Sequence, residues 1–298
     1  MMGDWIRDAA AAWDRFWFTP RSGTSLGLIR LLTGAIVVYM LLAWTPLLES
    51  FFGDGGMLPP QYAQDLFDSK FAWSHLGWIE SNGALWAVHL LAIAIAILYT
   101  AGIGTRITGP LVALLVISYS NRATPTLFGL DQIVAFLTLY LSFADCGSSF
   151  SLANRLWPQK QRKSVSVRNN LAIRLVQVHL CIVYLFAGLG KCQGSTWWNG
   201  EAIWGAVASH EYQTWDMTWM ADHMWLVSIV TMVVLFFEVS YCALIWSKLT
   251  RPLMLLLAIP LHLGIGLCMG MLEFGLIMLI ANIAFVNFPA GNPPRDSL

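Results

Sequence analysis

Long apolar segments, separated by short polar stretches, dominate the pattern of hydrophobic and polar positions along this 298-residue chain. A helix needs about 20 apolar residues to cross a membrane, and most of the segments reach that length. The third segment is short, and the fourth contains Asp131. The segments lie at residues 26–48, 84–104, 107–121, 127–145, 169–190, 224–246, 252–269 and 271–288. The pattern predicts an all-α polytopic membrane protein, a bundle of about eight transmembrane helices.

The composition agrees with a membrane environment. Hydrophobic residues make up 57% of the chain and charged residues only 11%, whereas a soluble domain carries about 25% charged residues. The formal net charge is zero, which gives no electrostatic basis for binding nucleic acid. Five scattered cysteines show no CxxC spacing, so we expect neither a metal site nor a disulfide framework.

The distribution of basic residues predicts the orientation. With both termini in the cytoplasm, twelve of the seventeen Lys and Arg residues fall on the inner side, and Lys70, Arg122 and Lys191 fall on the outer side. Arg30 and Arg174 complete the set and lie within helices. This asymmetry follows the positive-inside rule. We therefore expect a multi-pass protein of the cell membrane, specifically the inner membrane of a bacterium.

The two ends of the chain differ from the bundle. Trp5, Ala9, Phe16 and Trp17 repeat with helical spacing near the N-terminus, which predicts that residues 1–20 carry an amphipathic helix lying on the inner leaflet. Residues 289–298 are rich in proline and polar residues, which predicts a flexible tail. No domain boundary is visible, so we expect residues 1–298 to form a single membrane domain.

Several ionisable residues fall within or beside the apolar segments, where they are costly and often functional. Lys191 ends the fifth segment, and Asp131, His262 and Glu273 fall in the outer halves of other segments. An apolar site disfavours a charged amine, and a neutral Lys191 would be a usable general base. A nearby carboxylate would instead keep it charged. Lys191 is therefore a candidate base, a salt-bridge partner, or a residue whose side chain extends to the outer membrane interface.

A second group of charges is predicted near the inner face. Arg30 and Arg174 lie low on the first and fifth helices, and Glu238 lies over halfway down the sixth helix from outside. We interpret these three residues as structural charges that lock helices together as an ion pair or triad.

Several motifs, taken in order, resemble the HTTM (horizontally transferred transmembrane) family. Ala187–Lys191 (AGLGK) is followed by Trp198–Ala202 (WNGEA), and Gly27–Arg30 lies in the first helix. Gly129–Asp131 (GLD) lies in the fourth helix, and Leu261-His262 lies in the seventh. The resemblance covers about residues 20–288. The family includes the membrane part of vitamin K-dependent gamma-carboxylase.

The resemblance implies a function for these residues. Lys191 occupies the position of the lysine that deprotonates vitamin K hydroquinone, and Gly188 and Trp198 would contact that cofactor. Asp131, His262 and Glu273 would tune the base. A histidine that the carboxylase carries before its fourth helix has no counterpart here, although Asp131 lies within about a position of it. The large lumenal domain that holds the protein substrate is also missing, so glutamate carboxylation would require a partner that supplies it.

These observations leave more than one function open. The first hypothesis is a vitamin K- or quinone-dependent, carboxylase-like membrane enzyme whose Trp-rich outer loop shields the reaction from water. The alternative is a non-catalytic membrane factor for the maturation or assembly of an exported peptide, with the same tryptophans serving as interfacial anchors. A transporter ranks last, because no pair of discontinuous helices is visible.

Overall fold

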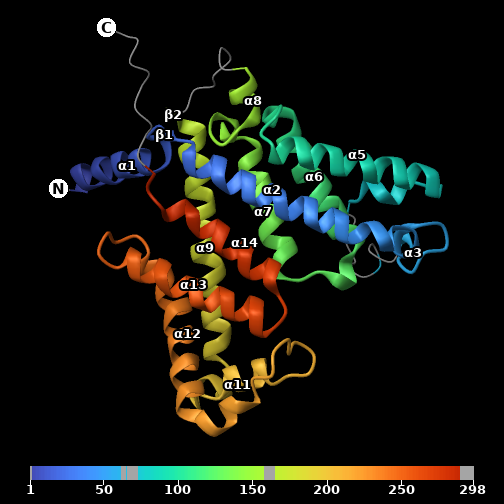
Figure 1. Cartoon of the computed structure of the whole chain (residues 1–298). Coiled ribbons are helices and arrows are strands. Elements are labelled where there is room, and N and C mark those ends of the chain that lie inside the picture. The colour runs from blue at the N-terminus through green and yellow to red at the C-terminus, as the bar shows by residue number, and fades with distance from the viewer. Residues whose placement is uncertain (1, 62–64, 66–72, 158–164, 289–298) are drawn as a thin grey trace. The chain divides into compact units, whose positions relative to one another are not determined.

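The structure, a computed structural model, describes residues 2–61, 65, 73–157 and 165–288, and within these residues it is helical apart from one short pair of strands (Figure 1). The strands β1 (Arg21–Ser22) and β2 (Val165–Ser166) pair antiparallel. The longer helices are α1 (Met2–Phe18), α2 (Thr24–Trp44), α5 (Asn82–Thr100), α6 (Thr105–Arg122), α7 (Gly129–Ser142), α9 (Val167–Cys192), α12 (Met224–Leu244), α13 (Arg251–Cys268) and α14 (Leu272–Asn282). The shorter elements are η1 (Thr45–Leu47), α3 (Leu48–Phe52), η2 (His75–Trp78), η3 (Thr124–Thr126), η4 (Cys146–Ser148), α8 (Leu152–Leu156), α10 (Ser195–Trp198), α11 (Ala202–Val207), η6 (Thr218–His223) and η7 (Ile283–Phe285).

The predicted fold class is confirmed, because each of the eight apolar segments forms a helix. Within the described residues, five stretches are long and apolar enough to cross a membrane, and they contain α2, α5, α9, α12 and α13. Helices α7 and α14 are apolar but shorter. The sides of these helices expose large apolar residues such as Leu256, which is 63% exposed. Apolar surface of this extent marks a protein that contacts lipid.

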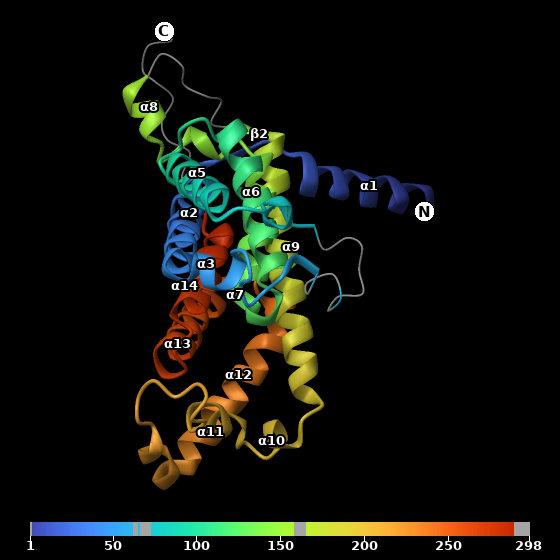
Figure 2. The same cartoon turned by 90° about the vertical axis from the view of Figure 1, so that its right-hand side faces the viewer.

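Contacts between residues group the chain into two compact units, and the boundary falls inside α9. The first unit contains residues 1–175 and 287–298, and the second contains residues 176–286. In the first unit α2 packs on α5, α5 on α6 and α6 on α7 (Figure 2). Leu26, Ile29, Tyr99 and Leu141 are fully buried between these helices. The predicted flexible tail at 289–298 lies outside the described residues.

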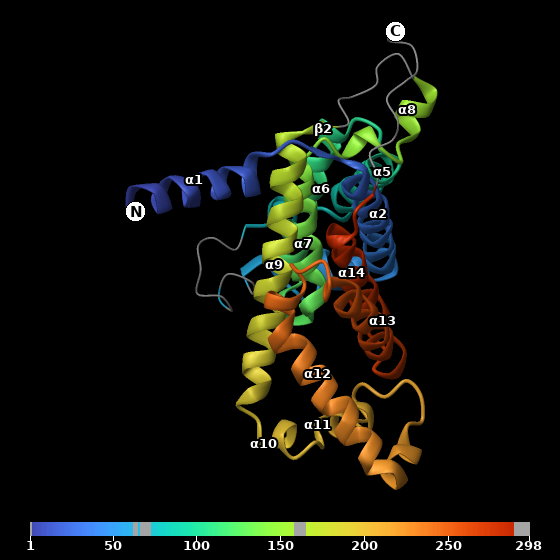
Figure 3. The ribbon, with the colours of Figure 1, turned by 90° about the vertical axis from the view of Figure 1, so that its left-hand side faces the viewer.

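Helix α1 is fastened to the first unit at its C-terminal end and extends away from it (Figure 3). Asn170 donates a hydrogen bond of 2.8 Å to the carbonyl of Phe16, and the Arg174 guanidinium lies 4.0 Å from the centre of the Phe16 ring. Trp5 and Trp13 remain 70% and 62% exposed. The predicted helix is thus present, and its placement on the inner leaflet stays a prediction.

In the second unit α13 and α14 pack as an antiparallel hairpin. Gly270 turns the chain between them with a φ of +69°, a left-handed conformation that glycine adopts without strain. Helices α10 and α11 pack beside the N-terminal part of α12 (Figure 3). Lys191 lies in this second unit.

Candidate functional site

Lys191 forms a largely buried ion pair with Glu238. Its Nζ lies 2.7 Å from Oε2 of Glu238 and donates a hydrogen bond of 3.0 Å to Oε1. The side chain of Glu238 is 9% exposed and that of Lys191 is 26% exposed. The Trp197 ring adds a cation–π contact, with its centre 5.3 Å from Nζ. The side-chain nitrogen of Lys191 therefore contacts both a carboxylate and an aromatic face.

Gly188 explains how the two helices approach closely enough for this pair. A Cβ atom added at Gly188 would lie 2.8 Å from Cγ2 and 2.9 Å from the backbone nitrogen of Val239. Any side chain at this position would therefore push α9 away from α12 at the level of Glu238. This contact gives Gly188 a packing role, and its predicted contact with a cofactor stays a prediction.

The prediction that Glu238 belongs to an inner layer and Lys191 to an outer layer is wrong, because the two side chains are in contact. The error comes from the start of α12. Glu238 lies about 21 Å along the helix from Met224, but α10, α11 and η6 pack against that first part of α12. The first part of α12 is therefore covered by the outer loop. Lys191, near the end of α9, lies beside Glu238 and not beside the first residues of α12.

The other two predicted structural charges bond to backbone carbonyls in the first unit. The buried Arg30 donates to the carbonyls of Cys146 and Phe150, at 3.2 Å and 2.5 Å. Arg174 donates a hydrogen bond of 3.1 Å to the carbonyl of Phe16. Both arginines thus fasten helices, as a structural role requires, whereas Glu238 has its ion pair with Lys191.

A buried hydrogen-bonded group continues from the ion pair along α9 and α12. Tyr184 lies two helical turns before Lys191, and its hydroxyl lies 2.6 Å from Nε2 of His262. Asn282 donates to the Tyr184 hydroxyl at 3.1 Å and accepts from the Tyr241 hydroxyl at 2.6 Å. Four helices, α9, α12, α13 and α14, are joined by this group. Networks of this kind fix helix register when every member is bonded.

The hydrogen bonds around Tyr184 favour one tautomer of His262. Asn282 donates to the Tyr184 hydroxyl, whose own proton can be donated to Nε2 of His262. The ring proton of a neutral His262 then lies on Nδ1, which is buried and has no hydrogen-bond partner among the described residues. His262 thus contacts Tyr184, and the prediction that it tunes Lys191 stays a prediction.

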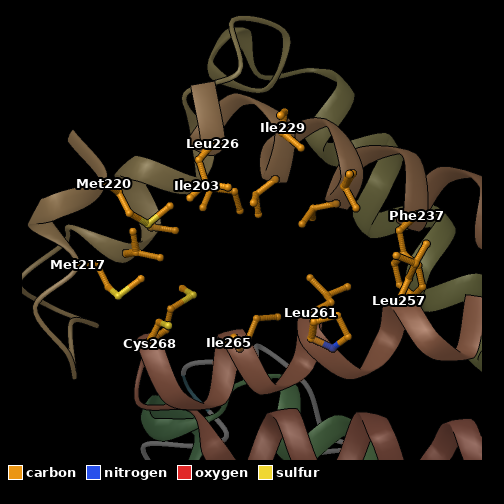
Figure 4. A pocket seen from close by; sticks show the side chains of 18 of the residues that line it. Ile203, Met217, Met220, Leu226, Ile229, Phe237, Leu257, Leu261, Ile265 and Cys268 are labelled. Atoms are coloured by element: carbon orange, nitrogen blue, oxygen red, sulfur yellow. The ribbon is translucent and has the colours of Figure 1, made fainter. Parts of the chain in front are cut away.

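A large apolar cavity of about 450 Å³ lies between α12, α13 and the segment containing α11 and η6. Figure 4 shows its lining side chains pointing into one space, with Leu226 and Ile229 of α12 opposite Leu261 and Ile265 of α13. Methionine and cysteine sulfur atoms lie at one end. A space of this size and lining suits a lipid-like or isoprenoid ligand.

The cavity ends close to the ion pair. Val234 and Phe237 of α12 line it, and Glu238 follows Val234 by four residues. Residues four apart share one face of a helix and are separated by about 6 Å along its axis. Glu238 therefore lies on α12 within one helical turn of two residues that line the cavity, and neither Glu238 nor Lys191 is itself among the lining residues.

Among the described residues, the remaining candidates form no hydrogen bond or ion pair with the side chains of Lys191 and Glu238. Asp131 belongs to the first unit, where its carboxylate caps the start of α7 by accepting from the backbone nitrogen of Phe128 at 3.1 Å. Glu273 opens α14 and is half-buried, and it has no ion pair with a described cation. Trp198 is 59% exposed and donates a hydrogen bond of 2.7 Å to the carbonyl of Cys192. No three His, Cys, Asp or Glu side chains in the described part of the chain are grouped to hold a metal.

Sequence reasoning missed three members of the polar network: Tyr184, Tyr241 and Asn282. A signal was present in the chain, because Tyr184 and Lys191 are seven residues apart and Glu238 and Tyr241 are three apart. Both spacings place polar groups on one face of a helix. Only the tertiary structure shows that the polar face of α9 lies opposite the polar face of α12.

Comparison with known proteins gives one match. A family model described as HTTM domain matches residues 18–289, nearly the whole chain. No curated protein and no solved structure matches the chain.

Proposed function

The chain belongs to the HTTM family, and from this premise we propose that it is a multi-pass membrane enzyme that acts on a lipid-soluble quinol. Lys191 serves as its base, as in the carboxylase-like hypothesis. The observation that carries the proposal is the apolar cavity, since Glu238 of the largely buried Lys191–Glu238 ion pair follows directly after a residue of α12, Phe237, that lines it.

The residues present fit a vitamin K-type hydroquinone. The apolar lining between α12 and α13 would hold an isoprenoid tail, and the ion pair offers polar groups next to the end of the cavity. Such a cofactor supplies an acidic phenolic hydroxyl and the reducing equivalents for oxygen chemistry. Water is largely excluded from the ion pair, because its side chains are mostly buried. This burial would strengthen the electrostatic interactions between the pair and a hydroxyl of the cofactor.

The ion pair defines what Lys191 must do before it can act as a base. Its ammonium transfers one proton to the Glu238 carboxylate, leaving a neutral amine and a neutral carboxylic acid. The amine can then accept a proton from an acidic hydroxyl. Burial makes the neutral pair more accessible, because it removes two charges from a site of low dielectric.

The closeness of the same pair favours a second candidate function. At 2.7 Å the Glu238 carboxylate stabilises the charged ammonium, which cannot accept a proton. In that case the pair only fastens α9 to α12, and the protein is a non-catalytic membrane factor for the maturation or assembly of an exported peptide. An extracytoplasmic partner would then supply any chemistry.

Ligand binding is tested first with a long-chain naphthoquinone added to the detergent-purified protein. We expect the melting temperature to rise for the wild type and for Leu256→Trp, whose site on α13 is exposed away from the cavity. The rise should be lost for Ile265→Trp, because the indole fills the cavity. An equal rise in both variants would show that the quinone binds elsewhere.

Catalysis is tested separately by quinol-dependent oxygen uptake. The enzyme hypothesis predicts that Lys191→Met keeps the quinone-induced rise in melting temperature and loses oxygen uptake. The factor hypothesis predicts no quinol-dependent oxygen uptake in the wild type. It also predicts that a double variant, Lys191→Met with Glu238→Met, keeps its biological activity because only the fastening between helices matters.

A further inference from the structure

Two nitrogen atoms of a buried arginine in the first unit lack a partner among the described residues. Arg122 is the last residue of α6 and is only 3% exposed. Its Nε and Nη1 atoms are buried and have no hydrogen-bond partner in the part of the chain that the structure describes. The guanidinium lies 5.4 Å from the centre of the Phe52 ring. A buried guanidinium without an anion is costly, so this site calls for an acceptor.

A histidine beside the same helix also lacks a partner. Nδ1 of His75 lies 2.5 Å from the Ser118 hydroxyl, which lies 3.0 Å from the Ser74 hydroxyl. When Ser74 donates to Ser118 and Ser118 donates to Nδ1, the ring proton of His75 lies on Nε2. That atom is buried and has no hydrogen-bond partner among the residues that the structure describes.

The two unpartnered groups belong to one place in the fold. Ser118, which holds the His75 ring, and Arg122 are four residues apart on α6 and therefore share one face, with Cβ atoms about 6 Å apart. The Tyr119 ring lies 6.0 Å from that of His75 and 6.2 Å from that of Phe52. The hydrogen-bonding capacity left over at this position is thus that of the Arg122 guanidinium, joined by the Nε2–H of His75 in the tautomer described, within about one helical turn.

The described carboxylates do not fill this position. No ion pair within 4.0 Å joins Arg122 to a described acidic residue. The carboxylate of Asp131 accepts a hydrogen bond from the backbone at the start of α7. We propose that Arg122 and His75 form a binding site for a phosphate-type oxyanion, contributed by a phospholipid headgroup or by free phosphate. A guanidinium presents forked donors that match phosphate oxygens.

Aromatic residues around the site favour the lipid as the source. Trp73 and Trp78 are 37% and 73% exposed, and their rings lie 5.9 Å apart. Exposed tryptophans of this kind concentrate at the level of lipid headgroups. The site lies at the end of α6 that the distribution of basic residues places on the outer side.

The test uses the full chain in dodecyl maltoside, a detergent without phosphate or charge. Its melting temperature is followed during titration with inorganic phosphate, with a short-chain phosphatidylglycerol and with sodium chloride at matched ionic strength. We expect a saturable rise with a phosphate-bearing compound but not with chloride. A rise with the lipid alone identifies a headgroup site, and a rise with inorganic phosphate identifies a site for the free ion.

Variants assign the effect to Arg122. Arg122→Gln should weaken the apparent affinity roughly tenfold to a hundredfold, as expected for charge-assisted hydrogen bonds, and Arg122→Lys should weaken it less. Arg106→Gln is the matched control, because the Arg106 side chain is 71% exposed, and it should behave as the wild type. If Arg122→Gln does not fold, the wild type and Arg122→Lys decide. No phosphate-specific rise in the wild type, or the same affinity in the Arg122 variants, would overturn the proposal.

Discussion

The Lys191–Glu238 ion pair predicts an unusual pattern of stability in single and double variants. Replacing Lys191 or Glu238 alone by methionine leaves a charge in a largely apolar site. Removal of one partner of a buried pair costs about 3–5 kcal/mol. Because the Lys191 side chain is 26% exposed, we expect a smaller loss for Glu238→Met, about 2–3 kcal/mol. Lys191→Met should cost more, since it strands the carboxylate that is only 9% exposed.

The double variant should recover most of this loss. Two unit charges about 3 Å apart attract by about 5 kcal/mol at an effective dielectric constant of about 20. Desolvation of the two ions costs several kcal/mol each, so the pair is close to balanced against two apolar side chains. Methionine has a similar length to both residues and no charge to desolvate. The double variant should therefore lie within about 1 kcal/mol of the wild type.

Chemical unfolding in mixed micelles measures the three free energies, and the coupling energy follows from the double-mutant cycle. Lys248→Met serves as the control, because Lys248 is exposed and its loss should change stability by less than about 0.5 kcal/mol. If the single variants are as stable as the wild type, Lys191 and Glu238 are not paired as described. If the double variant is less stable than both singles, the balance between attraction and desolvation is wrong.

Three further predictions follow from local geometry. Gly188→Ala should destabilise the protein by about 1–3 kcal/mol through overpacking, whereas Gly190→Ala, which would meet no atom within 4 Å, should not; equal melting temperatures would contradict the close approach of α9 and α12. Tyr241→Phe should cost about 1–3 kcal/mol because it leaves a buried amide oxygen without its 2.6 Å donor, while Tyr212→Phe at an exposed site serves as the control. Burial lowers the pKa of His75 below 6.5, so the folded state favours its neutral form. Its contribution to stability is complete above about pH 6.5 and is lost as pH falls below that value. Melting temperatures from pH 5 to pH 8 should therefore fall more steeply at the acidic end for the wild type than for His75→Gln, and parallel curves would contradict this.

The positions of the helices could be read from the chain because they depend on local composition. Each of the eight apolar segments forms a helix, since in lipid an apolar stretch must satisfy its own backbone hydrogen bonds. The amphipathic spacing of Trp5 and Phe16 likewise predicted α1. The assignment of Lys191 and Glu238 to two different layers was wrong, because depth was counted from the ends of apolar segments. Helix α12 is partly covered by the loop before it, which segment lengths do not reveal.

The sequence by itself determined the membrane class, the helical segments and which ionisable residues must find partners, because each of these depends on residues close together in the chain. Only the tertiary structure decided that the partner of Lys191 is Glu238, which is 47 residues away. The same holds for the cavity between α12 and α13. Pairing across a bundle depends on which helix faces touch, and a glycine such as Gly188 controls that contact without contributing any chemistry of its own.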